Sequence, residues 1–530
     1  MISKIEEIIK KVVGDGVRFL VTASEKPEFG HYSTNVAFSV GGDPQKLANE
    51  ILRQASAFAK ASADKQNLFD KVEAKGKFIN FWISKEALIK ELDGVLKSKK
   101  PHSLLKLWRA RKINLEFISA NPTGPLTMAN GRGGFLGDVL ANVLELAGNK
   151  VTREYYINDA GNQVKLLGES VLLARRSLGE GGGAIPHYQG GYVKDLAKKI
   201  KSKNAEEAGR EAASILLKEI QKSTKIVGIE FDIWFSEYEK LRKGGEVKKI
   251  LDLLEKKGML EKKEGAVWLK TSDIADEKDR VLVKSDGQPT YFLTDLAYHY
   301  DKFVKRESGL AIDIWGADHH GYVARLKSGV KALGIDPEKL KIIITQLVRL
   351  IEGGKEVKMS KRAGEFITLD DLVGEVGKDA VRFFFLMHSP DTHMDFDLAL
   401  AKEKSQKNPV YYVQYAYVRC GSILEKAKIK SIKHQASSIK KLESASELAL
   451  LRELVKWPDV VRQTAEDYQV HRLTRYASEI ARAFHNFYEK ERVIDEKGSI
   501  DEGKLALVLA ARQILEKVFD TLGISKLEKM

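Results

Sequence analysis

Apolar and polar residues alternate over 113–117, which predicts a β-strand, and apolar residues return at helical spacing over 135–144. Between these stretches the chain breaks at Asn121, Pro122 and Gly124, so the segment predicts a strand, a tight turn and a helix. A helix N-terminus leaves backbone N–H groups unpaired and carries partial positive charge, and this turn could therefore hold the phosphate chain of a nucleotide. The same kind of turn is more common in α/β proteins without a nucleotide site.

A basic run, KMSKR, spans residues 358–362 and follows a turn at Gly353 and Gly354. The side chains of Lys358 and Lys361 in such a loop could reach charge that develops on a pyrophosphate. For a lone cluster in a basic chain, a solvated surface loop is the commoner interpretation. The two motifs become informative only in combination.

The remaining hydrophobic pattern divides the chain into three parts. The N-terminal part opens with an amphipathic helix, and residues 72–83 alternate as a strand does. Two further strands, at 151–157 and 311–315, predict a βαβ nucleotide fold, and a mostly helical stretch from about 170 to 280 predicts an insertion within it. From about residue 400 the pattern is helical almost throughout, which predicts a bundle.

Composition narrows the class of protein. The 530 residues and 43% hydrophobic content suggest three or four globular domains. A net charge of +14 fits a nucleic-acid partner, although a basic proteome or simple solubility would give the same balance. The single cysteine, Cys420, excludes an internal disulfide and a Cys-rich metal site, and we expect it to be a packing residue. The sequence has no membrane-length apolar run, so a soluble cytoplasmic protein is expected.

Tyr291 and Asp295 are four residues apart and share a face if the segment is helical. One carboxylate beside one aromatic ring suits a guanidinium group, because the carboxylate can accept two charge-assisted hydrogen bonds while the ring borders the planar cation. On spacing alone, a surface acid in the first turn of a helix is the simpler interpretation.

Adjacent His319 and His320 follow the strand at 311–315. Neighbouring histidines point in different directions, and no Cys or third His follows at ligand spacing, so we predict no metal site held by the protein. A contact of His320 with an adenine or a phosphate is the better hypothesis.

In this order the two motifs resemble the paired HIGH and KMSKS elements of class I aminoacyl-tRNA synthetases. Further segments narrow the resemblance to arginyl-tRNA synthetases and cover nearly the whole chain. They are FGHYSTNVA (29–37), GKFINF (76–81), SANPTGPL (119–126), YYINDAGNQ (155–163), DRVLVKSDG (279–287), YFLTDLAYH (291–299), WGADHHGYVARLK (315–327), VKMSKRAG (357–364) and NPVYYVQYA (408–416).

The resemblance implies an α/β protein of three domains. Residues 1–105 would form an additional α+β domain that contacts tRNA. Residues 106–395 would form a Rossmann-like, doubly wound parallel-sheet catalytic domain with its helical connective insertion at about 170–280. Residues 396–530 would form an α-helical anticodon-binding bundle.

The resemblance also implies roles for individual residues. Those implied for catalysis are Thr127, Asn130, Lys358, Ser360 and Lys361. Those implied for arginine are Glu116, Ser119, Asn121, Tyr291 and Asp295. Those implied for ATP are Pro122, Gly124, Ala129, Gly316, Asp318, His320 and Met359. Those implied for tRNA are Tyr32, Asn35, Tyr412, Tyr415 and the C-terminal Met530. For Tyr32 and Asn35 an ordinary turn is as good an interpretation, and aromatic residues at helical spacing, such as Tyr412 and Tyr415, usually belong to a core.

One departure from the family pattern concerns the first motif. Where the family has His-x-Gly-His, this chain has Thr127, Met128, Ala129 and Asn130. The Thr hydroxyl and the Asn amide can still donate hydrogen bonds to a triphosphate, although more weakly than charged groups. The methyl group of Ala129 would occupy space that glycine leaves open for the adenine.

The implied activity is the ATP-dependent joining of L-arginine to tRNA(Arg) through an arginyl-adenylate, with Mg²⁺ on the phosphates and a monomeric protein. Two alternatives remain. The altered first motif would suit a catalytically impaired paralogue that only binds tRNA, and related phosphate motifs occur in adenylyltransferases that act on small molecules.

Overall fold

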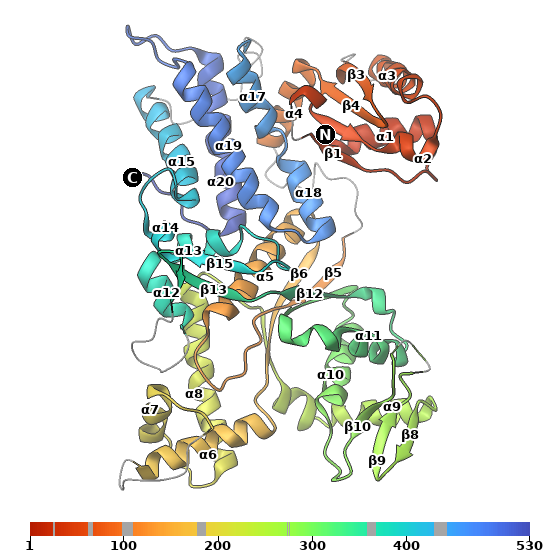
Figure 1. Ribbon diagram of the computed structural model, residues 1–530, viewed down its shortest axis with the longest axis vertical. Helices are drawn as coiled ribbons and strands as arrows, with labels where there is room; N and C mark the ends of the chain where they lie inside the picture. The colour runs from red at the N-terminus through yellow and green to blue at the C-terminus, as the bar shows by residue number, and fades with distance from the viewer. Residues whose placement is uncertain are drawn as a thin grey trace.

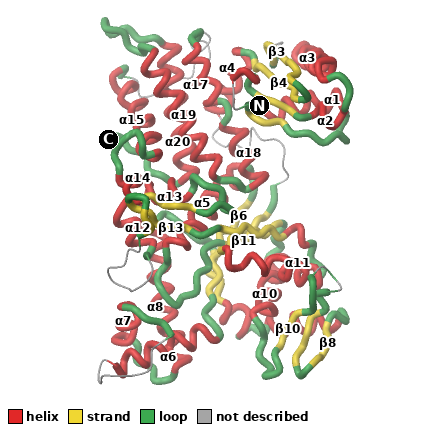
Figure 2. The backbone as a smooth tube through the Cα atoms, in the orientation of Figure 1, coloured by secondary structure: helices red, strands yellow, loops and turns green. Residues whose placement is uncertain are grey.

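The computed structural model describes residues 1–24, 27–61, 67–97, 110–177, 187–272, 274, 276–357, 367–428 and 442–530 (Figure 1). An N-terminal α+β unit lies beside a long helical bundle at one end of the molecule, and the central sheet lies below them (Figure 1). At the opposite end, a group of helices and a small antiparallel sheet extend from the central unit (Figure 2).

The N-terminal unit combines a four-stranded antiparallel sheet, in the order β1-β2-β4-β3, with helices. Its elements are α1 (Ile2–Val13), β1 (Val21–Ala23), β2 (Tyr32–Thr34), α2 (Val36–Val40), α3 (Pro44–Ala61), β3 (Phe69–Lys75), β4 (Phe78–Ile83) and α4 (Lys85–Lys97). The single strand predicted over 72–83 is wrong, because the chain reverses at Gly76 with a φ of +62° and forms two paired strands. Gly76 is the only glycine or proline over 69–83, which is too weak a turn signal for a pattern-based prediction.

The central sheet is parallel throughout and has the order β12-β11-β5-β6-β7. Its strands are β5 (Lys112–Glu116), β6 (Lys150–Ile157), β7 (Ile233–Ser236), β11 (Leu310–Gly316) and β12 (Leu340–Thr345). The strand order runs outward from β5 in both directions, which places a topological switch point between β5 and β11. This confirms the predicted doubly wound parallel sheet and its strands at 113–117, 151–157 and 311–315.

Successive residues of β5 face opposite sides of the sheet. Ile113 and Leu115 join the core that includes α5 (Met128–Leu146), whereas Glu116 meets Lys302, which directly follows α10 (Tyr291–Tyr300). One face of the sheet is therefore apolar, and the other carries buried charge.

The stretch predicted to be a helical insertion is only partly helical. It contains α6 (Asn162–Ser177), α7 (Gly191–Lys199), α8 (Ala205–Ile226) and α9 (Glu246–Lys256), but also β7 of the central sheet. It continues into a three-stranded antiparallel sheet formed by β8 (Leu260–Lys263), β9 (Ala266–Leu269) and β10 (Arg280–Val283). These four-residue strands carry too little pattern to be recognised, and pairing with their neighbours decides their structure.

A second small sheet, β14-β13-β15, and a set of helices connect the central sheet to the bundle. The connecting elements are α11 (Val323–Ala332), β13 (Val348–Glu352), β14 (Lys355–Glu356), α12 (Leu369–Val376), α13 (Lys378–Phe385), β15 (Met394–Asp397) and α14 (Leu398–Lys402). The bundle consists of α15 (Pro409–Lys426), α17 (Ala445–Leu454), α18 (Trp457–Asp467), α19 (His471–Lys490) and α20 (Glu502–Leu522). Cys420 is fully buried in α15, which confirms it as a packing residue.

The N-terminal unit contacts the bundle through the buried carboxylate of Asp459 on α18. The Tyr32 hydroxyl donates to Asp459 Oδ2 at 2.8 Å, and the backbone N–H of Ile2 donates to Oδ1 at 3.1 Å. Tyr32 is only 2% exposed, so the prediction that it contacts tRNA is wrong for this conformation. Its phenol ring is part of the contact between the two units.

None of the described helices combines the length and the apolar composition that crossing a membrane requires.

Helices α6 and α8 cross closely at two glycines. A Cβ atom on Gly168 would lie 1.8 Å from the Ala205 carbonyl oxygen, and one on Gly209 would lie 2.0 Å from that of Val164. We expect Gly168→Ala to destabilise this helix pair by about 1–3 kcal/mol, because backbone atoms would have to move apart.

Gly374 in α12 is the matched control, since a Cβ there meets no atom within 4 Å. Gly374→Ala should raise stability by about 0.5–1 kcal/mol through helix propensity. Thermal unfolding followed by circular dichroism measures both variants, and equal shifts for the two would contradict the close crossing.

Candidate functional site

A cavity of about 1260 Å³ lies at the carboxyl ends of the parallel strands, where a doubly wound sheet binds its ligands. Its walls come from the turn after β5, the start of α5, the segment after β6, the start of α10 and the segment after β11. The cavity brings together most of the residues predicted for the substrates. The predicted substrate residues that line the cavity are Glu116, Ser119, Asn121, Gly124, Thr127, Ala129, Asn130, Tyr291, Asp295, Gly316 and Asp318.

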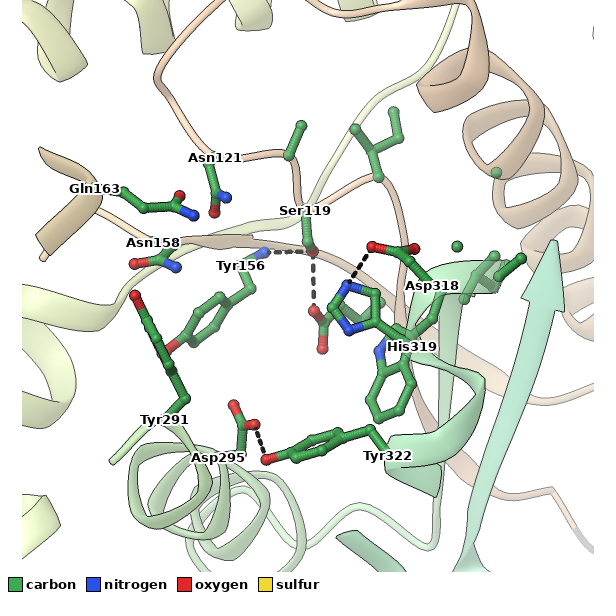
Figure 3. Close-up of a pocket in the computed structure, with 18 of the residues that line it drawn as sticks. Ser119, Asn121, Tyr156, Asn158, Gln163, Tyr291, Asp295, Asp318, His319 and Tyr322 are labelled. Carbon is green, nitrogen blue, oxygen red and sulfur yellow. Dashed lines mark hydrogen bonds and ion pairs between the residues drawn. The ribbon is translucent and has the colours of Figure 1, made fainter. Parts of the chain in front are cut away.

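The turn after β5 has an unusual backbone. Ile118 and Ser119 have φ angles of +66° and +40°, a region that non-glycine residues enter at a cost. The Ser119 hydroxyl donates to Glu116 Oε1 at 2.9 Å and accepts from the backbone N–H of Tyr156 at 3.0 Å (Figure 3). These bonds hold the turn against β5 and β6 and present Ser119 and Asn121 to the cavity.

Thr127 and Asn130 form a capping box at the start of α5. The Thr127 backbone N–H and hydroxyl both donate to Asn130 Oδ1 at 2.8 Å, and Thr127 Oγ1 accepts from the Asn130 backbone N–H at 3.4 Å. In this arrangement the Thr127 hydroxyl donates to Asn130 rather than into the cavity. The amide nitrogen Nδ2 of Asn130 makes no hydrogen bond within the described part of the chain.

The second motif lies outside the described residues, and with it the predicted roles of Lys358, Met359, Ser360 and Lys361. Its flanking residues are described. The Met128 backbone N–H donates to the Ile367 carbonyl at 3.0 Å, and that of Leu369 donates to the Leu126 carbonyl at 2.9 Å. The chain that follows the second motif is therefore paired with the chain that begins α5.

Asp295 is the acidic centre of the cavity. The Tyr322 hydroxyl donates to Asp295 Oδ2, and the carboxylate points into the cavity together with the side chain of Tyr291 (Figure 3). No Lys or Arg among the described residues forms an ion pair with Asp295. Burial is the main reason why the pKa of Asp295 rises to about 6, so its surroundings in the protein stabilise its negative charge poorly.

The neighbouring buried carboxylates do have cationic partners. Lys302 Nζ lies 2.6 Å from Glu116 Oε2 and 2.7 Å from Asp313 Oδ1, and its own side chain is fully buried. Glu237 pairs with Arg242 at 2.6 Å. Because each of these carboxylates already has a cation at close range, Asp295 is better placed than they are to receive a cationic ligand.

Tyrosines surround the Asp295 carboxylate. Tyr291 is 53% exposed at the cavity mouth, Tyr156 donates to Glu237 Oε2 at 2.8 Å, and Tyr322 binds Asp295 itself. Sequence reasoning missed Tyr156, Tyr322 and Glu237. The two tyrosines lie within motif segments, but only the fold brings them to Asp295.

Polar amides line the side of the cavity next to the turn after β6. Asn121, Asn158 and Gln163 lie together there (Figure 3). The Oδ1 atom of Asn158 is buried and has no hydrogen-bond partner in the described structure. Such an atom is costly unless a ligand or a water donates to it, which supports a binding role for this side of the cavity.

The segment after β11 lines the remaining wall with Gly316, Asp318 and His319. A Cβ on Gly316 would lie 2.6 Å from Asp318 Oδ1, so a larger residue there would displace the exposed Asp318 side chain from this position. His319, rather than the predicted His320, lines the cavity, and Pro122 lies buried behind its wall. No group of three potential metal ligands occurs among the described residues.

The residues predicted for tRNA lie far from this cavity. Tyr412 and Tyr415 on α15 pack against His485 of α19, with ring centroids 4.7 and 5.6 Å apart. The Arg419 guanidinium lies 5.2 Å above the Tyr415 ring, and Met530 is 46% exposed. In the N-terminal unit, Asn35 Oδ1 accepts from the backbone N–H of Leu20 at 2.8 Å.

Three family descriptions match separate parts of the chain. Residues 1–83 match "Arginyl tRNA synthetase N terminal domain", residues 189–389 match "tRNA synthetases class I (R), catalytic domain", and residues 413–530 match "DALR anticodon binding domain". Their order agrees with the three units of the structure.

Curated relatives match over the full length. The chain is 39% identical to an arginine–tRNA ligase of Acetivibrio thermocellus, with 100% of both chains covered. It is 40% identical to an arginine–tRNA ligase of Carboxydothermus hydrogenoformans, with 97% of this chain and 95% of the relative covered.

Solved structures have the same fold. A putative arginyl-tRNA synthetase from Campylobacter jejuni aligns with a TM-score of 0.75 and 32% identity, covering 84% of this chain and 100% of the other. The arginyl-tRNA synthetase of Thermus thermophilus aligns with a TM-score of 0.79 over 100% of both chains. At 22% identity, this second likeness concerns the fold alone.

The raised pKa of Asp295 predicts a pH-dependent gain in stability on Asp295→Asn. A carboxyl group whose pKa is higher in the folded state costs stability as pH rises from the ordinary value of 3.8 to about 6, and the cost then stays constant. The Asn variant does not titrate and can still accept from Tyr322. Its advantage should be small at about pH 4 and reach about 3 kcal/mol at about pH 8.

Urea unfolding of both proteins at these two pH values measures the difference. A variant that is less stable than the wild type at the higher pH would show that the Asp295 charge is already compensated.

Proposed function

The chain belongs to the arginyl-tRNA synthetase family, and we propose how its cavity carries out the reaction of that family. Its activity is the ATP-dependent attachment of L-arginine to tRNA, with an arginyl-adenylate as the intermediate. The observation that carries the proposed site is the half-buried Asp295 carboxylate, which lacks a basic partner among the described residues and lies beside three tyrosines.

Asp295 would bind the guanidinium group of arginine. A planar guanidinium can donate two parallel hydrogen bonds to one carboxylate while its faces rest against aromatic rings such as that of Tyr291. Glu116, held by Lys302, and Ser119 would line the same end of the cavity, and Asn121 would face the amino-acid end of the substrate. A neutral side chain would leave the Asp295 charge buried and unpaired, so the site favours arginine.

ATP would lie between the start of α5 and the segment after β11. The Asn130 amide and the Ala129 backbone N–H would face the phosphates, with Gly124 and Pro122 on the same side. Gly316 and Asp318 would approach the ribose, with His319 and His320 next to them. From the second motif, Lys358, Met359, Ser360 and Lys361 would complete this wall, and Mg²⁺ would bind mainly to phosphate oxygens.

The reaction then needs positioning rather than a covalent enzyme intermediate. The arginine carboxylate attacks the α-phosphorus of ATP, the adenylate forms and pyrophosphate leaves. The 2′-hydroxyl of the terminal adenosine of tRNA then attacks the arginyl carbonyl, and AMP leaves. Protein donors and Mg²⁺ would stabilise the charge that develops on the phosphates.

The tRNA would contact the helical bundle and the N-terminal unit. Asn35, Tyr412, Tyr415 and Met530 remain the proposed contact residues, and the net charge of +14 favours binding of a polyanion. We further infer that the partner is tRNA(Arg), that the protein acts as a monomer and that it works in the cytoplasm.

We expect Asp295→Asn to lower kcat/KM for arginine in charging of tRNA(Arg) by about 10²–10³-fold, because a buried charged partner is lost. Arginine binding to the wild type should also weaken as pH falls below about 6, where Asp295 becomes protonated. Isothermal titration and a charging assay with ATP and Mg²⁺ measure the two effects. Tight tRNA binding without any charging by the wild type would instead favour the impaired paralogue.

Asn130→Asp separates the capping role of Asn130 from its proposed phosphate contact. The carboxylate keeps the acceptor oxygen that receives both hydrogen bonds from Thr127 and suits a helix N-terminus, so stability should be unchanged or higher. Its negative charge would repel the triphosphate, and we expect KM for ATP to rise about tenfold or more while KM for arginine stays constant. An unchanged KM for ATP would place the phosphates away from Asn130.

A further inference from the structure

Arg132 is a buried cation in the second turn of α5, two residues after Asn130. Its side chain is 2% exposed and forms no ion pair within the described residues. The guanidinium donates instead to four backbone carbonyls. Nη1 lies 2.8 Å from Gln346 O and 3.4 Å from Leu347 O, and Nη2 lies 2.9 Å from Ser389 O and 2.7 Å from Thr392 O.

These carbonyls belong to two loops that meet in front of α5. Residues 346–347 connect β12 to β13 and line the cavity, and residues 389–392 precede β15. The loops also bind each other, since the Gln346 backbone N–H donates to the Pro390 carbonyl at 2.8 Å. The Arg132 guanidinium thus ties both loops to the helix whose first turn carries Thr127 and Asn130.

The loop at 346–347 also leads to the second motif. It continues into β13, the turn at Gly353 and Gly354, and β14, which ends two residues before Lys358. Within the described structure, the placement of β13 against α5 therefore couples the position of the first motif to that of the chain leading to the second. On the outer side, the Ser389 hydroxyl donates to Gln469 Oε1 at 3.0 Å, in the segment between α18 and α19.

Burying the Arg132 guanidinium in this space costs free energy. Burial lowers the pKa of Arg132, which shows that the surroundings disfavour its charge. An apolar or neutral side chain would avoid that cost. What arginine alone offers is a rigid planar fork whose two ends reach two loops at once, which the single ammonium of lysine cannot reproduce.

We propose that Arg132 is a positioning residue for adenylate formation, which fixes the loop at 346–347 and the start of β13 against the first turns of α5. The first turns of α5 and the loop at 346–347, which would form the two sides of the proposed nucleotide site, then stay at a constant distance from each other. Arg132 makes none of its hydrogen bonds with α10, so it should leave arginine binding at Asp295 unchanged. The inference rests on the proposed function, because it needs ATP to lie between α5 and the loop at 346–347.

The test compares Arg132→Lys and Arg132→Gln with Arg349→Gln. The last is a matched control, because Arg349 pairs with Asp395 at 2.8 Å across β13 and β15 on the exposed side and makes no hydrogen bond with α5 in the described structure. Arg132→Gln removes the buried charge and should fold even if the lysine variant does not. The measurements are arginine affinity by calorimetry, ATP–pyrophosphate exchange in the presence of tRNA, and hydrogen exchange of residues 346–356.

We expect both Arg132 variants to bind arginine within about twofold of the wild type, whereas exchange should slow by about 10²-fold, the scale of a misplacement of about 1 Å. Hydrogen exchange should become faster over 346–356 and remain unchanged over 291–300. The Arg349 variant should match the wild type in arginine affinity and in pyrophosphate exchange.

Two results would overturn the inference. One is pyrophosphate exchange by an Arg132 variant at a rate close to that of the wild type, and the other is a loss of arginine affinity that parallels the loss of rate, as general unfolding would produce. If the wild type binds arginine but catalyses no exchange with tRNA present, the proposed function fails and the role of Arg132 fails with it. An active wild type beside equally active variants refutes the role of Arg132 alone.

Discussion

The ammonium group of Lys302 lies between carboxylates on two adjacent strands of the central sheet, Glu116 on β5 and Asp313 on β11. All three groups are buried, and each would be costly alone, because a charge in the interior needs an opposite charge at close range. Their mutual attraction holds the carboxyl ends of β5 and β11 together at the topological switch point. The same ion pairs therefore support both the pairing of β5 with β11 and the geometry of the site.

The influence of these ion pairs extends to both ends of the arginine site. Glu116 accepts from Ser119, which stabilises the left-handed turn that presents Asn121. On the other side, His299 Nε2 lies 2.9 Å from Asp313 Oδ2, and its Nδ1 lies 2.8 Å from the Asp295 carbonyl oxygen. The strand carboxylates thus help to hold both the turn and the helix that carries Asp295. Glu116 and Asp313 share the one ammonium of Lys302, whereas Asp295 has no Lys or Arg partner among the described residues, so Asp295 is the carboxylate left for a monovalent cation.

The sequence predicted this site where local pattern determines structure. A strand, a turn and a helix over 113–144 follow from periodicity and turn residues, and a helical spacing of four puts Tyr291 and Asp295 on one face. The burial of Tyr32 could not be predicted, because its partner Asp459 lies more than four hundred residues away in the chain. The pairing of Thr127 with Asn130 is local, but a capping box and a pair of phosphate donors use the same residue types. Pattern alone does not separate these two roles.

The use of Thr127 and Asn130 in a capping box affects how the altered first motif can act on ATP. Charged histidines would act on phosphates directly, whereas here Thr127 uses its hydroxyl to cap α5 and Asn130 keeps only its amide for a ligand. The cap still fixes the start of α5, whose partial positive charge would favour phosphates at the proposed site. The same turn is paired with residues 367–369, which follow the second motif. On the proposed assignment, stabilisation of the pyrophosphate therefore moves from side chains of the first motif toward the helix N-terminus, Mg²⁺ and the lysines of the second motif.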